Sequence, residues 1–217
     1  MNIINLFYDD IPVNVEFIKF LIKNDIQIND EIMNCASRNG HLEVVKYLHS
    51  IGVKCTVNAM DWASMNGHFE VVKYLHSIDA KCSVDAMDGA SMNGHLEIVR
   101  YLHSIGAKYT TKAMDWASEH GHLEVVKYLH SIGAKCGIDA IDRASLRGHL
   151  EVIKYLCSNG AKYTEDAIDS ASAYGHLEVV KYLHSIGTDC IIDRQSAGWY
   201  RHLELKKYSD AINAHDD

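Results

Sequence analysis

One eleven-residue segment recurs along the chain at a fixed spacing, and this repetition constrains the fold more than any other feature. The segment is GHLEVVKYLHS at residues 40–50, and its near copies begin at glycines spaced 27 residues apart, namely Gly40, Gly67, Gly94, Gly121, Gly148 and Gly175. A fixed period between about 20 and 50 residues is the signature of a solenoid, in which one supersecondary unit stacks on copies of itself.

The period extends over the whole chain. A degenerate copy occupies residues 14–21, and a last copy at residues 202–208 is displaced by one residue. We therefore expect one repeat domain of about eight repeats over residues 1–217, with an N-terminal capping repeat at 1–28, internal repeats at 29–190 and a C-terminal capping repeat at 191–217. Lys206 and Ser209 stand where internal repeats have apolar residues, as a cap with a polar outer face requires.

Each repeat carries two helical patterns. In its second half, Val71, Val72 and Leu75 follow helical spacing and form a wide apolar stripe. In its first half, Ala59 and Ala63 form a narrower edge of small residues, which allows close approach of neighbouring helices. The predicted fold is therefore all-α, a solenoid of stacked helix-turn-helix repeats.

Caps and glycines mark the predicted ends of these helices. The residues that precede the first helix are expected to be N-caps, with one glycine among them: Asn29, Thr56, Ser83, Thr110, Gly137 and Thr164. The glycine between the helices is expected to adopt the left-handed conformation that closes the first helix. A second glycine closes the second helix in most repeats, and Asp79 takes this place in one of them.

Composition narrows the functional class. The chain is 47% hydrophobic and 23% charged, as in soluble folded proteins, and its net charge of −8 argues against nucleic acid as the main partner. No signal-peptide pattern and no apolar stretch of membrane-spanning length occur, so we expect a cytoplasmic protein, with the nucleus possible, that is not secreted. The six cysteines are expected to be free thiols, because stacked helices hold equivalent residues too far apart for a disulfide.

The repeated sequence resembles a known family. Residues 67–75, GHFEVVKYL, and Gly106-Ala107-Lys108 resemble the second helix of the ankyrin repeat, GHLEVVKLL, and the Gly-Ala-Asp that follows it. The shortened repeats look most like those in giant viruses of amoebae and some protists, which implies the host cytoplasm if the chain is viral. The usual period of this family is about 33 residues. The missing residues correspond to its β-hairpin finger, so we expect fingers that are absent or reduced to a tight turn.

Histidine and aspartate recur, which first suggests a metal or catalytic site. Eleven of the fourteen histidines fall in two positions of the repeat, beginning at His41 and His49. Zinc ligands must converge on one ion, and one histidine per repeat cannot do so, hence neither a metal nor another cofactor is predicted. The aspartates that begin at Asp61 and Asp85 also recur. They suggest architecture rather than catalysis, or else an exposed acidic strip that biases the choice of partner.

Three positions of the first helix vary freely from repeat to repeat, whereas most positions of the repeat barely change. Two of them correspond to recognition positions on the concave side of ankyrin repeats, which implies partner contact; drift on a solvated surface is the alternative. The candidate partner-binding residues are Arg38, Asn39, Trp62, Met65, Asn66, Met92, Asn93, Trp116, Glu119, His120, Arg143, Leu146, Arg147, Ser170 and Tyr174. Trp62 and Trp116 are expected to lie on one apolar strip bordered by aspartates. The alternative is that they are buried and fill the space left by small residues such as Gly89.

The predicted function is a non-catalytic scaffold for protein–protein interaction that binds its partner on the first-helix face. No Gly-rich phosphate loop and no nucleophile–histidine constellation appears, so an enzyme is not expected. An adaptor that recruits a host ubiquitin-ligase or signalling component is the alternative, on family analogy alone. The expected partner is another protein, with neither nucleic acid nor membrane, and the chain is expected to be a monomer.

Overall fold

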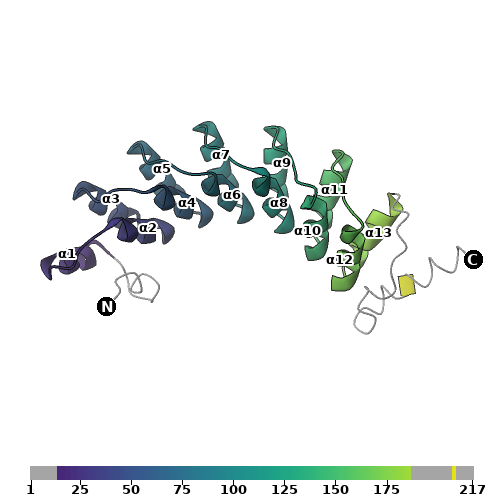
Figure 1. Cartoon of the computed structure of the whole chain (residues 1–217), viewed down its shortest axis with the longest axis horizontal. Helices are drawn as coiled ribbons and strands as arrows, with labels where there is room; N and C mark the ends of the chain where they lie inside the picture. The colour runs from purple at the N-terminus through teal and green to yellow at the C-terminus, as the bar shows by residue number, and fades with distance from the viewer. Residues whose placement is uncertain (1–13, 187–206, 209–217) are drawn as a thin grey trace, which may run out of the picture. The chain divides into compact units, whose positions relative to one another are not determined.

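The computed structural model describes residues 14–186 and 207–208. In this part of the chain it contains thirteen α-helices and no strand, which confirms the all-α prediction and the absence of fingers there (Figure 1). The contacts divide the chain into two compact units, Met1–Ala113 and Met114–Asp217, and the boundary falls within one helix. The two units are described separately.

The first unit holds one single helix and three helix pairs. The single helix α1 is the second helix of repeat one. The helices are α1 (Val15–Lys23), α2 (Asp30–Arg38), α3 (Leu42–Ser50), α4 (Val57–Met65), α5 (Phe69–Ser77), α6 (Asp85–Met92) and α7 (Leu96–Ser104), followed by the first part of α8 (Thr111–Glu119). Each pair is one 27-residue repeat, and first helices pack on first helices, as α4 does on α2 and α6.

The second unit continues the same pattern from the remainder of α8. Its helices are α9 (Leu123–Ser131), α10 (Ala140–Arg147), α11 (Leu150–Ser158), α12 (Asp166–Tyr174) and α13 (Leu177–Ser185). The first helices again pack on one another, as α10 does on α12. Most of the predicted C-terminal cap, with Lys206 and Ser209, lies outside the described residues, as does Cys190.

Small and branched side chains form the core of each repeat as the sequence predicted. Val71, Val72 and Leu75 of α5 are at most 1% exposed, and Ala59 and Ala63 of α4 are fully buried. Because alanine projects only a methyl group, α4 and α6 can approach closely. The first helices therefore form a narrow inner layer, and the second helices carry the larger apolar stripe.

The glycine between the two helices has two structural reasons. Gly67 has a φ of +83°, and the following His68 donates its backbone N–H to the carbonyl of Ala63 at 2.9 Å, which closes α4. An added Cβ at Gly67 would also overlap the imidazole of His95 from the next repeat. The predicted left-handed cap is confirmed, and its close approach to the next repeat is an additional finding.

The predicted N-caps are only partly confirmed. Asn29 accepts the backbone N–H of Ile32, and Thr110 accepts that of Lys112 at 3.2 Å. Thr56 makes no such bond, so its predicted role was wrong. Its hydroxyl donates instead to Asn34 of the preceding repeat at 2.8 Å. The difference arises because this hydroxyl has an acceptor across the repeat boundary, which sequence proximity does not show.

Asp79 provides a test of backbone strain in the repeat. Its φ is +60°, in the region that favours glycine, and equivalent positions such as Gly52 and Gly106 have φ of +85° and +77°. We expect Asp79→Gly to raise the free energy of unfolding by about 0.5–1 kcal/mol, because glycine has no Cβ to strain there. Urea unfolding measures this change. Asp79→Asn is the control and should change little; a clear loss of stability in Asp79→Gly would show that the carboxylate makes a stabilising contact.

Candidate interaction surface

The aspartates that begin at Asp61 do not form an exposed acidic strip. Asp61 is 4% exposed and Asp88 is fully buried. The carboxylate of Asp61 accepts the backbone N–H of Ser83 at 2.9 Å and its hydroxyl at 2.7 Å. The predicted acidic strip at this position was therefore wrong, because the carboxylate is buried and accepts hydrogen bonds from the next repeat.

The same bond recurs between successive repeats within each unit. Asp88 binds the backbone N–H and hydroxyl of Thr110 at 2.9 and 2.6 Å, and Asp142 binds those of Thr164 at 3.0 and 2.7 Å. Gly137 has no hydroxyl, and its backbone N–H alone donates to Asp115 at 2.6 Å. Each of these carboxylates thus fixes the segment that leads into the next first helix.

The second set of aspartates lies at the surface. Asp85, Asp139 and Asp166 are exposed at the start of their helices, where a negative charge complements the helix dipole. This confirms the predicted location in the first turn for Asp85 and Asp166, while Asp139 precedes α10 by one residue. Their charge is available to a partner, unlike that of Asp61 and Asp88.

The histidines that begin at His41 lie in the turn between the helices and contact the preceding repeat. In the second unit the Nε2 of His176 donates to the carbonyl oxygen of Leu146 at 3.0 Å, and its ring covers Gly148. Burial lowers the pKa of His41, His95 and His149, and neighbouring histidines lower it further. These rings serve as neutral packing and hydrogen-bonding groups in the stack.

The histidines that begin at His49 form a second link between repeats, which the sequence analysis missed. The Nδ1 of His49 lies 2.9 Å from the hydroxyl oxygen of Tyr74, and the two rings meet edge to face. The pairs His76–Tyr101 and His130–Tyr155 repeat this geometry at 2.8 Å. Histidine and tyrosine both recur every 27 residues, which is the signal that could have revealed the pairs.

Two departures from the histidine–tyrosine pairing are informative. Cys157 replaces the histidine that would face Tyr182. Tyr208 lies 3.4 Å from the Nδ1 of His184, at a separation of 24 residues where the other pairs have 25. The shift of one residue agrees with the displaced copy predicted at residues 202–208.

The histidine, cysteine, aspartate and glutamate residues of the described ranges are the residues that could bind a metal ion. No group of three or more histidine, cysteine, aspartate or glutamate side chains among them could hold a metal ion. Five cysteines are free thiols, and burial raises the pKa of each: Cys35, Cys55, Cys82, Cys136 and Cys157. Repeated histidines and aspartates instead connect one repeat to the next.

The variable first-helix residues of the first unit form a partly apolar surface. Trp62 and Met65 are half-buried, and the guanidinium of Arg38 lies 5.8 Å from the centre of the Trp62 ring. The Met65 side chain, rather than Trp62, fills the space beside Gly89. Asn93 is exposed and donates its side-chain amide to the carbonyl of Met65 at 2.8 Å.

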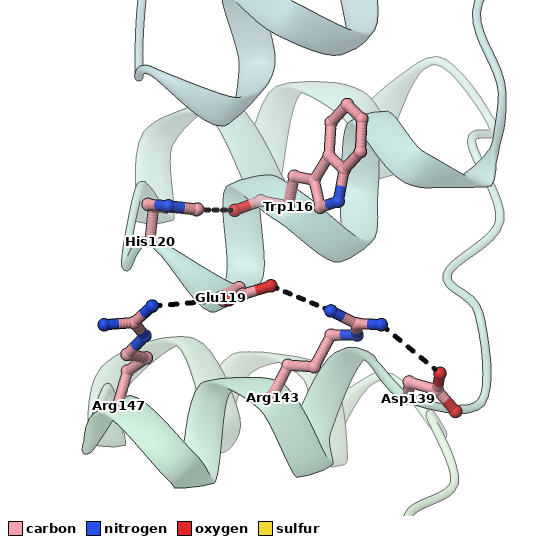
Figure 2. A network of polar contacts seen from close by, with 6 residues as sticks. All are labelled: Trp116, Glu119, His120, Asp139, Arg143 and Arg147. Carbon is pink, nitrogen blue, oxygen red and sulfur yellow. Dashed lines mark hydrogen bonds and ion pairs between the residues drawn. The ribbon is translucent and has the colours of Figure 1, made fainter.

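The variable residues of the second unit are more polar (Figure 2). Glu119 lies between two arginines of α10, with its carboxylate 3.1 Å from Arg143 and 3.6 Å from Arg147. His120 donates to the carbonyl of Trp116 at 2.9 Å, one turn earlier on the same helix. Sequence analysis proposed these residues for one face, and the contacts bring Glu119, Arg143 and Arg147 together.

The remaining candidates have individual roles. Asn39 and Asn66 donate their side-chain amides to carbonyls four residues earlier, so part of their function is to close the first helix. Met92, Leu146 and Ser170 are half-buried, and Tyr174 is 63% exposed. Trp62 and Trp116 belong to different units, so their common strip stays a prediction, and its predicted aspartate border is wrong because Asp61 and Asp88 are buried.

Comparison with known proteins now identifies the family. A family model of ankyrin repeats matches three times, at residues 13–88, 62–142 and 116–194. The chain belongs to the ankyrin-repeat family. Its shortened repeat differs from the usual one by replacing the finger with a short segment held by a carboxylate, as at Asp88 and Thr110.

Solved structures support the fold of this ankyrin-repeat protein. The crystal structure of the human ASB11 ankyrin repeat domain matches with 21% sequence identity and a TM-score of 0.61, over 72% of this chain and 84% of that one. At this identity the likeness shows the fold alone. No curated protein sequence matches the chain. No helix in the described ranges is long and apolar enough to cross a membrane.

The half-buried histidines and the partly or fully buried aspartates predict opposite responses to acid. Because the pKa of His41, His95 and His149 lies below the ordinary 6.5, the unfolded chain takes up protons first, and stability should fall as pH drops below that value. Burial raises the pKa of Asp61 and Asp115 above 3.8, so the folded chain binds more protons just above that value. Their contribution therefore raises stability as pH falls through the raised pKa.

Urea unfolding between about pH 7 and about pH 5 measures the histidine effect. His149→Gln should reduce the slope of stability against pH in this window. The control variant is His49→Gln. His49 is exposed and lies outside the turn, where it pairs with Tyr74. Equal slopes for wild type and His149→Gln would contradict the assignment of His149 as a half-buried, neutral group.

Proposed function

We propose that this ankyrin-repeat protein is a non-catalytic scaffold that binds another protein through the variable residues of its first helices. Ankyrin repeats are generally modules for protein–protein interaction, and their fold is typically non-enzymatic. The net charge of −8 favours a protein over a nucleic acid as partner. The free thiols fit a reducing compartment, such as the cytoplasm or nucleus.

One observation carries this proposal. Positions of the repeat that change little have a structural contact, as shown by the buried Asp88 bound to Thr110 and by Gly67 beneath His95. The candidate residues at the variable positions of the first helix are exposed or half-buried, whereas Cys35 and Gly89 at one of these positions are buried. What occupies that position changes from Trp62 to Arg143 to Ser170. The fold does not require different side chains at equivalent positions. A surface that recognises one particular partner does, because each repeat contacts a different part of that partner.

The chemical character of these residues also suits a protein partner. Tryptophan, tyrosine, methionine and arginine are enriched at interface centres. Trp62 and Met65 in the first unit and Trp116 and Arg147 in the second supply these types. A rigid stack of repeats loses little conformational entropy on binding, so contacts from several repeats can add to useful affinity.

Paired substitutions test the proposal. One chain carries Trp62→Ala and Tyr174→Ala, with one change on the first helices of each unit. The control chain carries Val57→Ala and Ile138→Ala, which remove exposed apolar side chains, 45% and 65% exposed, outside the variable positions. Both chains serve as bait in quantitative affinity capture from a lysate of the source cells.

We expect the first variant to lose a partner that wild type and control retain, with binding weakened by about 2 kcal/mol or more. Its melting temperature should fall by only a few degrees, as expected for partly exposed side chains. Equal recovery of the same partners by both variants would contradict the proposed face. A loss of about 3–5 kcal/mol of folding stability from Trp62→Ala would instead mark Trp62 as a core residue.

A further inference from the structure

We propose that part of this surface in the second unit binds an acidic segment of the partner protein. We call it the arginine face and define it by Trp116, Glu119, His120, Arg143, Arg147 and Tyr174. The inference rests on the proposed scaffold function and adds the chemical class of the partner. The inference depends on the exposure of the charged side chains of α8 and α10 and of Tyr174 on α12.

The two arginines of this face share a single internal carboxylate. Arg143 and Arg147 lie one helical turn apart on α10, and Figure 2 shows both reaching toward Glu119 of α8. Glu119 Oε2 is 3.1 Å from Arg143 Nη1, and Glu119 Oε1 is 3.6 Å from Arg147 Nη2. Glu119 alone therefore offsets one of the two positive charges, and the carboxylate of Asp139, 3.9 Å from Arg143, offsets part of the other.

Exposure makes the outer surface of this cluster positive. The Glu119 side chain is only 14% exposed, whereas those of Arg143 and Arg147 are 46% and 57% exposed. A partner that approaches Arg147 meets its guanidinium group and has little access to the Glu119 carboxylate, whereas beside Arg143 it also meets the exposed carboxylate of Asp139. Each guanidinium has five N–H donors in a planar fork that matches a carboxylate. Donors therefore remain for an incoming Asp or Glu side chain.

Other ion pairs in the same unit have the opposite exposure. Lys127 lies 2.7 Å from Glu124 and Lys154 lies 2.8 Å from Glu151, both on second helices. In each of these pairs the lysine is 44% exposed and the glutamate is 68% or 69% exposed, so the outer charge is mainly negative. The arginine face thus differs in sign from the surface around these second-helix pairs.

The electrostatic surroundings favour the Arg147 end of the face. Asp139 lies 3.9 Å from Arg143, at the start of α10, and partly offsets that arginine. At the other end, Arg147 is 3.6 Å from Glu119, farther than the 3.1 Å between Arg143 and Glu119. Arg147 is therefore less offset by carboxylates than Arg143, and we expect an acidic side chain to dock there first.

The aromatic residues beside the arginines add an apolar component. Tyr174, at the repeat position equivalent to Arg147, is 63% exposed on α12, and Trp116 is half-buried on α8. Such rings supply contact area at low cost in side-chain entropy. An acidic segment with an apolar residue close to its carboxylate fits this combination. In a chain with net charge −8, long-range attraction of that segment would be weak, so local contacts must provide the affinity.

A selection of short random peptides displayed on phage tests the proposal with the purified full chain. The test variant is Arg143→Gln/Arg147→Gln. The matched control is Lys127→Gln/Lys154→Gln, which changes the net charge by the same amount in the same unit. The lysine ion pairs are exposed on both sides, and the substituted arginines are themselves about half exposed, so we expect both variants to fold. Circular dichroism and urea unfolding verify that the arginine variant, which leaves the mostly buried Glu119 without these partners, stays folded.

We expect wild type and the lysine variant to enrich peptides rich in Asp and Glu, with apolar residues beside them. The arginine variant should bind a synthetic copy of the best peptide about 10-fold or more weakly, because charge-assisted hydrogen bonds are lost. Added salt should weaken wild-type binding. Enrichment of basic or purely apolar peptides, equal binding by the arginine variant, or no enrichment of any peptide would overturn the proposal.

These outcomes are separable from the scaffold function. If the lysate partner is lost by the Trp62→Ala/Tyr174→Ala variant but retained by the arginine variant, the scaffold stands and the acidic specificity is wrong. If wild type retains neither a lysate partner nor any peptide, both proposals fail.

Discussion

A partly or fully buried carboxylate that binds the start of the next repeat is the interaction on which this structure depends. The segment before each first helix has backbone N–H groups that need acceptors once they are buried. Asp88 supplies one to Thr110, and Asp142 supplies one to Thr164, in each case 22 residues later. We infer that this bond lets the repeat omit the finger, because one side chain fixes the connecting segment that the finger would otherwise organise.

This dependence separates the residues that build the stack from those available for recognition. His95 contacts Gly67 at positions that are the same in the internal repeats, and the bonds of Asp88 occupy positions that change little. The histidine–tyrosine pairs, such as His76 with Tyr101, link the second helices. First-helix residues between these positions can change without loss of the connection. The ankyrin-repeat architecture therefore tolerates Trp62 in one repeat and Arg143 in another.

Sequence periodicity predicted the helices and the glycine caps because both depend on local spacing and backbone conformation. It failed for Asp61 and Thr56, whose acceptors and donors belong to another repeat. Aspartates that recur every 27 residues give the same sequence pattern whether their side chains are exposed or buried. The sequence therefore could not distinguish an exposed acidic strip from buried hydrogen-bonded carboxylates. The cluster of Glu119 with Arg143 and Arg147 was predicted only as a set of variable residues, since its relative exposure depends on side-chain packing.

A double-mutant cycle on Asp88 and Thr110 tests most directly whether the carboxylate couples neighbouring repeats. Urea unfolding of Asp88→Ala, Thr110→Val and the double variant gives their interaction energy, and the Asp142–Thr164 pair provides an independent repetition in the second unit. The account predicts a coupling of about 1–2 kcal/mol, as for a hydrogen bond to a buried charge. Effects that add to within about 0.3 kcal/mol in both pairs would contradict it.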